Sequence, residues 1–272
     1  MKQMKESNSP ISDFETLSHI AYELSMQFEG LQTKDFRKGI STHYLAKMVS
    51  SCISLLRLYP GSTMLDNNEP MDYPSIATLM RNILELSNNH WYLCTQTIND
   101  EELKFRLKLY DYHDSSSLLS IYQNIFSNDD FSKELEEDIN RLKSQIENSP
   151  VYRGFNIKKR KKIIKGHKAY DLSQFQIAEK RGLNLKQFKG FYELFSIHTH
   201  SSPSSIKFVK TEKLNFDKQD ISESFAELSL IYVSRFLSEF IKVIGENWGI
   251  EFAKEESFNL VYNFADELYE EE

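Results

Sequence analysis

Residues 220–244, DISESFAELSLIYVSRFLSEFIKVI, decide the fold class of this chain. Their apolar residues recur at three- and four-residue spacing, which predicts an α-helix that starts at Asp217 or Asp220 and ends near Ile244. The apolar residues form two stripes, one made of Leu230, Val233, Leu237 and Phe240 and the other of Ile221, Phe225, Leu228 and Tyr232. A helix that is apolar on two sides is buried among other helices. We therefore expect this helix at the centre of a bundle.

The same helical spacing continues through the rest of the chain. Residues 75–149 and 204–272 contain no proline, and the whole chain has only 9 Gly and 6 Pro, so a many-turned all-β fold is excluded. Asp72 and Pro74 form a helix start signal, as N-cap and first-turn residue. Further helices are predicted over 11–30, 36–58, 74–97, 100–126, 130–147, 173–181, 185–200 and 254–269. The prediction is an all-α, single-domain bundle of about seven to nine helices.

A basic segment interrupts this pattern. Arg153–Lys168, RGFNIKKRKKIIKGHK, holds 8 Lys or Arg and no acid, whereas the other residues comprise 25 basic and 40 acidic ones. We expect an N-terminal helix over 1–35 and a bundle domain over 36–272, with 150–184 as a basic loop or lid inserted into it. The segment either contacts the phosphates of RNA or another nucleic acid, or is a solvated loop that the acidic residues of 246–272 neutralise. The predicted nucleic-acid-binding residues are Lys158, Lys159, Arg160, Lys161 and Lys162.

Several kinds of chemistry are excluded by what the sequence lacks. Cys52 and Cys94 cannot build a disulfide framework or a four-cysteine zinc site. No glycine-rich phosphate loop, Gly-x-Ser-x-Gly elbow or His-Glu-x-x-His motif occurs, so we expect no cofactor and no metal. The N-terminus lacks an apolar signal core, and the longest nearly uncharged apolar run, 48–56, is too short to span a membrane. We expect a cytoplasmic bacterial protein that does not bind membranes.

Two polar motifs stand out in otherwise apolar helices. Arg81 and Glu85 are four residues apart, so they share one face of the predicted helix over 74–97. Tyr192, Ser196 and His200 follow one another at four-residue steps and share a stripe on the helix over 185–200. The Arg–Glu pair is either a structural ion pair, the polar wall of a pocket or an exposed pair with little effect on stability. His200 lies near a helix C-terminus, where the helix dipole favours a protonated imidazole.

The combination of Arg-x-x-x-Glu with a later Tyr-x-x-x-Ser-x-x-x-His-Ser resembles a family of bacterial all-helical proteins known as domain of unknown function 5677. The matching residues are Arg81, Glu85, Tyr192, Ser196, His200 and Ser201. The likeness covers roughly residues 40–240. It implies that these residues face one another across the bundle. The family has no settled activity that could be transferred to this chain.

These observations favour a phosphodiester hydrolase, such as a ribonuclease or nucleotide-processing protein of a bacterial phage-defence or toxin system. Arg81 would stabilise a phosphate, His200 would act as general acid or base, and Glu85 would orient one of them. Tyr192, Ser196, His198 and Ser201 would line the pocket. The HEPN-type ribonuclease signature is an Arg and a His on one helix with four to six residues between them. It is not met, because eight residues separate Arg81 from His90, and the Arg160–His167 pair, with six, lies in the basic segment.

The alternative is a non-catalytic module that binds a small ligand or a partner and contains a buried Arg–Glu–His network. A homodimer is also open, since the sequence does not determine the oligomeric state.

Overall fold

The computed structural model describes residues 9–64, 71–126, 130–200, 202–207, 219–250 and 255–269. Within these ranges eleven α-helices and one π-helical turn have defined bounds, and no residue lies in a β-strand. The all-α prediction is confirmed. The predicted count of seven to nine helices is too low, because short helices form inside the basic segment and a π-helical turn follows the third helix.

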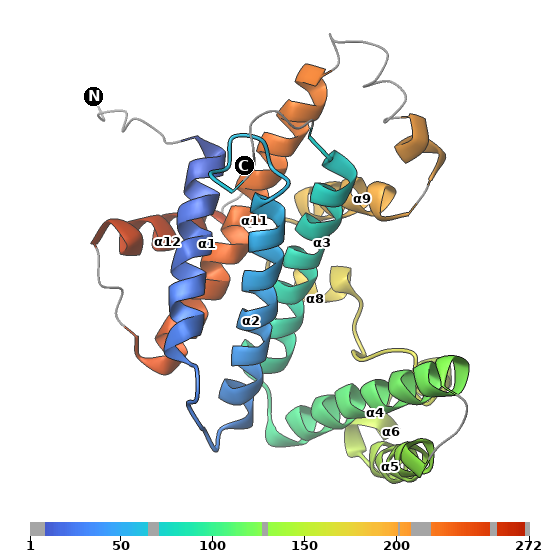
Figure 1. The fold of residues 1–272 in the computed structure, drawn as a ribbon. Helices are drawn as coiled ribbons and strands as arrows, with labels where there is room; N and C mark the ends of the chain where they lie inside the picture. Colours follow the sequence, from blue (N-terminus) through green and yellow to red (C-terminus); the bar gives the residue numbers. More distant parts are fainter. Residues whose placement is uncertain are drawn as a thin grey trace. The chain divides into compact units, whose positions relative to one another are not determined.

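The chain divides into two compact units (Figure 1). The first unit consists of residues 1–95 and 174–272, and the second of residues 96–173. The elements of the first unit are α1 (Pro10–Gln27), α2 (Phe36–Leu56), α3 (Tyr73–His90), η1 (Trp91–Thr95), α8 (Gln174–Arg181), α9 (Leu185–Thr199), α11 (Gln219–Trp248) and α12 (Glu255–Glu267). Those of the second unit are α4 (Asp100–Ile125), α5 (Asp130–Glu147), α6 (Pro150–Gly154) and α7 (Ile157–Ile163).

Helix α11 is the central helix of the first unit and packs against α1, α2, α3 and α12. Its first predicted stripe is confirmed as core, since Leu230, Val233, Leu237 and Phe240 are fully buried. Among the described side chains of the second stripe, only Tyr232 is buried. Its ring stacks on that of Phe191 of α9, with the ring centroids 4.1 Å apart. Phe225 and Leu228 are 40% and 56% exposed, so their predicted burial is wrong. Ile221 belongs to the same stripe, and its side chain lies outside the described residues.

Helix α3 begins as predicted and ends differently. The Asp72 side chain accepts a hydrogen bond from the Ser75 N–H at 3.3 Å, and Pro74 occupies the first turn. The regular α-helix stops at His90 instead of continuing to residue 97, and the chain makes the π-helical turn η1. A π-helical turn widens the backbone, and such turns occur frequently at functional sites.

The second unit is built on the α4–α5 pair, with α6 and α7 packed against it. Its core consists of Phe105, Leu109, Tyr112, Leu142, Ile146, Tyr152 and Ile163. Residues 150–184, expected as a basic loop or lid, contain α6, α7 and the predicted helix over 173–181, which is α8. Residues 153–168 fold into short helices because Asn156 caps α7 by accepting a hydrogen bond from the Lys159 N–H at 2.9 Å and because Ile163 enters the core.

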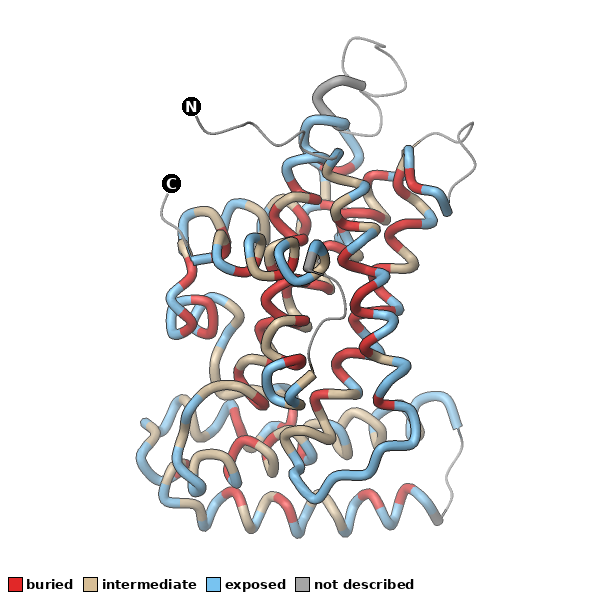
Figure 2. Tube along the Cα trace, turned by 90° about the vertical axis from the view of Figure 1, so that its left-hand side faces the viewer, coloured by how far each residue is buried: buried red, intermediate tan, exposed pale blue. Residues whose placement is uncertain are grey.

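The distribution of burial follows the helices in both units. Figure 2 shows buried positions recurring along the long helices, whereas the described connecting segments are largely exposed or intermediate. Among the described residues, no helix combines the length and the apolar character needed to cross a membrane.

Candidate functional site

Helix α3 carries the predicted Arg–Glu pair on the side that faces α9. Ile76, Met80, Ile83 and Leu84 of α3 are fully buried, and α3 packs against α2, α9 and α11. Arg81 and Glu85 lie beside this apolar face and remain partly exposed, with side-chain exposures of 21% and 32%. The pair is therefore reachable by a ligand while resting on a rigid helix.

Arg81, Glu85 and Tyr192 form a hydrogen-bonded triad. Arg81 Nε donates to Glu85 Oε1 at 2.9 Å, and Arg81 Nη2 donates to the Tyr192 hydroxyl at 3.0 Å. The Tyr192 hydroxyl in turn donates to the same Glu85 Oε1 at 2.6 Å. The triad joins α3 to α9 across a gap of more than a hundred residues in sequence. The Arg-x-x-x-Glu motif of α3 and the Tyr-x-x-x-Ser motif of α9 therefore meet, as predicted, through the Tyr192 side chain.

The electrostatics of the triad keep Arg81 charged and Tyr192 protonated. Burial alone would lower the pKa of Arg81, but the hydrogen bond with Tyr192 and the negative charge of Glu85 raise it overall. Burial raises the pKa of Tyr192, and the hydrogen bond to Glu85 raises it further. At neutral pH the site therefore presents a guanidinium, a carboxylate that accepts two hydrogen bonds, and a neutral phenol.

Aromatic rings form the side of the triad that lies towards α8. Phe175 of α8 packs edge-on against both Phe188 and Tyr192, with ring centroids at 5.8 and 5.3 Å. Phe188 and Tyr192 stack at 5.7 Å, and the Arg81 guanidinium lies 4.9 Å from the Tyr192 ring centroid. Low-polarity neighbours strengthen the interactions of a guanidinium with an anion, because they displace water from one side of it.

The other residues predicted for the site lie along the second half of α9. Ser196 donates its hydroxyl to the backbone carbonyl of Tyr192, one turn earlier on the same helix. His198 is 9% exposed, packs edge-on against Tyr73 at 5.0 Å, and has its pKa lowered by burial. His200 is the exposed C-cap residue of α9. Ser201 lies outside the described residues.

His200 is separated from the triad along the helix axis. His200 follows Tyr192 by eight positions, which corresponds to a rise of about 12 Å. The hydrogen bonds described for the triad connect Arg81, Glu85 and Tyr192 to one another and do not include His200. Its participation in a shared site stays a prediction.

A second polar cluster, which the sequence analysis missed, lies deeper in the first unit. The Arg181 guanidinium donates to Glu239 Oε2 at 2.6 Å, to Asn88 Oδ1 at 2.8 Å and to Ser87 Oγ at 3.0 Å. Its Nε donates to the Tyr269 hydroxyl at 3.3 Å, which donates to Glu239 at 2.9 Å. The Arg181 side chain is 0% exposed. We call these five residues the Arg181 network.

The Arg181 network had one signal in the sequence. Asn88 follows Arg81 by seven residues, which is two turns of α3, so Arg81, Glu85 and Asn88 continue one polar line along the helix. The Asn88 amide also donates to Gln174 at 3.1 Å, and Gln174 donates to Asn89 at 2.8 Å. The partners Arg181 and Glu239 come from distant helices and have no spacing pattern that could reveal them.

The predicted nucleic-acid-binding residues lie on α7 in the second unit. Lys158, Lys161 and Lys162 are exposed, and Arg160 is half-buried. Lys159 is engaged within the unit, because its ammonium lies 2.6 Å from Asp171 Oδ2 and 3.8 Å from the Phe155 ring centroid. Lys158, Lys161 and Lys162 are therefore free to contact the phosphates of a nucleic acid, whereas Lys159 is held in place by Asp171 and Phe155.

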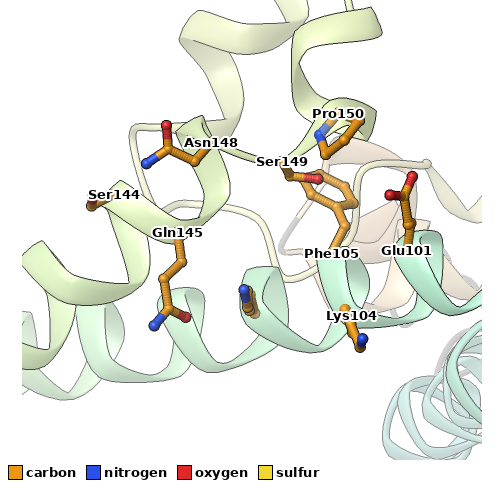
Figure 3. A pocket seen from close by; sticks show the side chains of 9 residues that line it. Glu101, Lys104, Phe105, Ser144, Gln145, Asn148, Ser149 and Pro150 are labelled. Carbon is orange, nitrogen blue, oxygen red and sulfur yellow. The ribbon is translucent and has the colours of Figure 1, made fainter.

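The second unit also contains a polar cavity between α4 and the end of α5 (Figure 3). Its volume is about 400 Å³, and Glu101, Lys104 and Lys108 of α4 contribute its charges. Figure 3 shows Phe105 beneath Ser149 and Pro150, and Gln145 reaching from α5 towards α4. The mixed signs of its charges indicate no preference for an anion or a cation.

No metal site is found in the described part of the chain, where no three His, Cys, Asp or Glu side chains gather closely enough to hold an ion.

The chain matches the family of unknown function DUF5677 over residues 38–220. It belongs to this family. The match includes most of α2, all of α3 and α9, and the whole second unit, so the triad and the basic helix α7 both lie inside it. No curated protein and no solved structure matches the chain.

Proposed function

We propose that this DUF5677 protein is a metal-independent ribonuclease whose active site is the Arg81–Glu85–Tyr192 triad. The observation that carries the proposal is the geometry of the triad, a partly exposed guanidinium and carboxylate locked together by a phenol. RNA supplies its own nucleophile, the 2′-hydroxyl, so its cleavage needs a base and a charge stabiliser rather than a metal ion.

In the proposed reaction Glu85 accepts the proton of the 2′-hydroxyl. The 2′-oxygen forms a bond to phosphorus while the bond from phosphorus to the 5′-oxygen breaks, which yields a 2′,3′-cyclic phosphate and a 5′-hydroxyl end. Arg81 stabilises the negative charge on the non-bridging oxygens of the phosphate, because a planar guanidinium donates two parallel hydrogen bonds to them. Tyr192 holds the Glu85 carboxylate in place. The proton for the 5′-oxygen comes from solvent water, and the general-acid role expected of His200 stays a prediction from the sequence.

The basic helix α7 supports RNA as the substrate class. Lys158, Lys161 and Lys162 offer exposed positive charge to the phosphate backbone. A role in phage defence and a cytoplasmic setting stay predictions from the sequence.

A non-catalytic binding module is the second candidate, and one observation favours it. All three hydrogen bonds of the triad are internal and connect α3 to α9, as expected of a structural clamp. Under this reading the triad stabilises the first unit, and loss of any member lowers its stability.

Cleavage of a single-stranded RNA oligonucleotide in the presence of EDTA tests the proposal. Glu85→Gln is expected to lower the rate by about 10²–10⁴-fold through loss of the general base. Arg81→Lys is expected to lower it by about 10²–10³-fold, because the ammonium cannot form the paired contacts. Cyclic phosphate ends identify the reaction.

The exposed α5 pair provides matched controls, since Arg141 lies 2.7 Å from Asp138 on one helix face. Arg141→Lys and Asp138→Asn should leave cleavage unchanged. If pure wild-type protein does not cleave RNA, and Arg81→Lys only lowers the melting temperature, the triad is a clamp and the ribonuclease proposal is wrong.

A further inference from the structure

A positively charged cavity lies against helix α7 in the second unit. Its volume is about 530 Å³, within the range of small-molecule sites. Arg160, Lys161 and Lys165 contribute three positive charges to its lining, against the single negative charge of Glu147. This excess distinguishes it from the cavity of Figure 3, where Glu101 accompanies two lysines. The α7 cavity is therefore suited to an anion.

Arg160 supplies a donor for which the described residues offer no hydrogen-bond partner. Its Nε atom is buried and has no hydrogen-bond partner among the described residues. A buried donor left without an acceptor is costly, and a charged donor more so, so such atoms usually meet a ligand or an ordered water. Lys159, its neighbour on α7, is by contrast already paired with Asp171.

The lining also includes apolar side chains. Tyr152 and Ile157 both line the cavity, and Ile157 is 64% exposed. Burial and the charge of Glu147 raise the pKa of Tyr152 while Arg160 lowers it, which places the phenol within the field of both charged groups. The ligand that fits such a lining joins an anionic group to a flat apolar one.

The chain just after α7, which includes cavity-lining Ile164, is fixed to α4 by hydrogen bonds. The Tyr112 hydroxyl donates to the Ile164 carbonyl at 2.7 Å, and His113 Nδ1 lies 2.8 Å from the Gly166 carbonyl. Gly166 has a φ of +72°, and a Cβ there would lie 2.6 Å from Ser116 Oγ, so this turn requires glycine. A preformed site loses less conformational entropy on binding.

We propose that the α7 cavity binds one nucleotide. Its phosphate contacts Arg160, Lys161 and Lys165, and its base packs against Tyr152 and Ile157. The choice of RNA as the source of this nucleotide rests on the proposed function, whereas a free mononucleotide has the same chemistry and fills the same cavity.

The test compares two triple variants that remove the same charge from the same segment. Arg160→Gln/Lys161→Gln/Lys165→Gln alters the cavity lining, and Lys158→Gln/Lys162→Gln/Lys168→Gln alters exposed residues outside it. Binding of adenosine and uridine 5′-monophosphate is measured by calorimetry, and binding of a fluorescent single-stranded RNA tetranucleotide by anisotropy. All measurements are made at about 0.15 M salt, where exposed charges are screened. The parent protein and both triples also carry Glu85→Gln, which prevents cleavage of the RNA.

The cavity triple is expected to weaken binding by about tenfold or more, since one charge-assisted hydrogen bond is worth that factor. The surface triple is expected to weaken mononucleotide binding by less than about threefold, because its lysines lie outside the cavity, and to weaken tetranucleotide binding less than the cavity triple does. If the mononucleotides bind, a free nucleotide is sufficient to fill the cavity. If only the tetranucleotide binds, the nucleotide comes from an RNA strand. Either result supports the proposed cavity site.

Equal losses in the two triples would overturn the proposal in favour of diffuse attraction by the whole basic segment. Absence of binding by the Glu85→Gln parent to any of these ligands would overturn it as well. The two proposals can fail separately. If the wild-type protein does not cleave RNA but the cavity triple still weakens nucleotide binding, the cavity site is supported and the ribonuclease proposal is wrong. Far-ultraviolet circular dichroism confirms that both triples remain helical.

Discussion

His90 shows how burial alone can determine the state of a titratable residue. It is 2% exposed at the end of α3, where its Nε2 shares a hydrogen bond with the Ser41 hydroxyl and its ring packs on Phe240 at 4.5 Å. Burial, together with the smaller effects of the charges of Arg181 and Arg37, lowers its pKa to about 3. His90 is therefore neutral in the folded protein at neutral pH.

We predict that His90 makes the folded state less stable in mild acid. Its folded pKa, about 3, lies below the unfolded value of 6.5. Between these values the unfolded chain binds more protons, so stability is full above about pH 6.5 and falls by up to about 1.4 kcal/mol per pH unit on acidification. Urea unfolding at pH 7.5, 6 and 5 should show a shallower pH dependence for His90→Gln than for wild type.

His43 provides the control, since it is exposed on α2. His43→Gln should retain the wild-type pH dependence. Identical slopes for wild type and His90→Gln would contradict the assignment of the acid sensitivity to His90.

At the scale of elements, the Arg181 network fastens the first unit together. Arg181 at the end of α8 contacts α3 through Ser87 and Asn88 and α11 through Glu239. Tyr269, just after α12, completes it. A buried ion pair adds little stability over an apolar replacement of both partners, but removal of one partner leaves an uncompensated charge. The network is therefore sensitive to single substitutions.

We predict that Arg181→Met destabilises the protein by about 3–5 kcal/mol, because Glu239 is left buried without its partner. Arg141→Met, which breaks an exposed pair on α5, should cost less than about 1 kcal/mol. Chemical denaturation followed by circular dichroism gives both values. The double variant Arg181→Met/Glu239→Leu should recover part of the loss, and a double variant less stable than either single one would contradict the pairing.

At the scale of the whole molecule, the two proposed activities lie in different compact units. The triad belongs to the first unit and α7 to the second. The chain as a whole carries a net charge of −7, so attraction to RNA cannot come from its average charge and depends on the local basic segment. Binding and cleavage should consequently be separable by mutation.

We predict that Lys158→Gln/Lys161→Gln/Lys162→Gln reduces the salt dependence of RNA binding. Each phosphate contact contributes about 0.7 to the slope of log K against log salt for a single strand, so loss of three contacts lowers the slope by about 2. Lys180→Gln/Lys186→Gln/Lys189→Gln in the first unit changes the net charge equally, and all three of these lysines are exposed. An equal change of slope in both variants would show that only net charge matters.

The sequence by itself determined the helical elements and much of the candidate site. The 130–147 helix has the predicted bounds, and Asp72 caps α3 as expected, because capping and apolar spacing act between residues close in sequence. Arg81 and Glu85 were found for the same reason, since one turn of helix separates them. Tyr192 was singled out by its stripe on α9.

Only the tertiary structure decided which of these residues meet. Tyr192 closes the triad, whereas His200 lies about two turns further along α9. Arg181 and Glu239, which are 58 residues apart, form the most buried ion pair of the first unit's described residues. The short helix inside the basic segment, the pairing of Lys159 with Asp171 and the partly exposed stripe of α11 were likewise set by packing. The physical reason is that local spacing fixes which side chains share a helix face, while the contacts between helices depend on how distant faces are buried together.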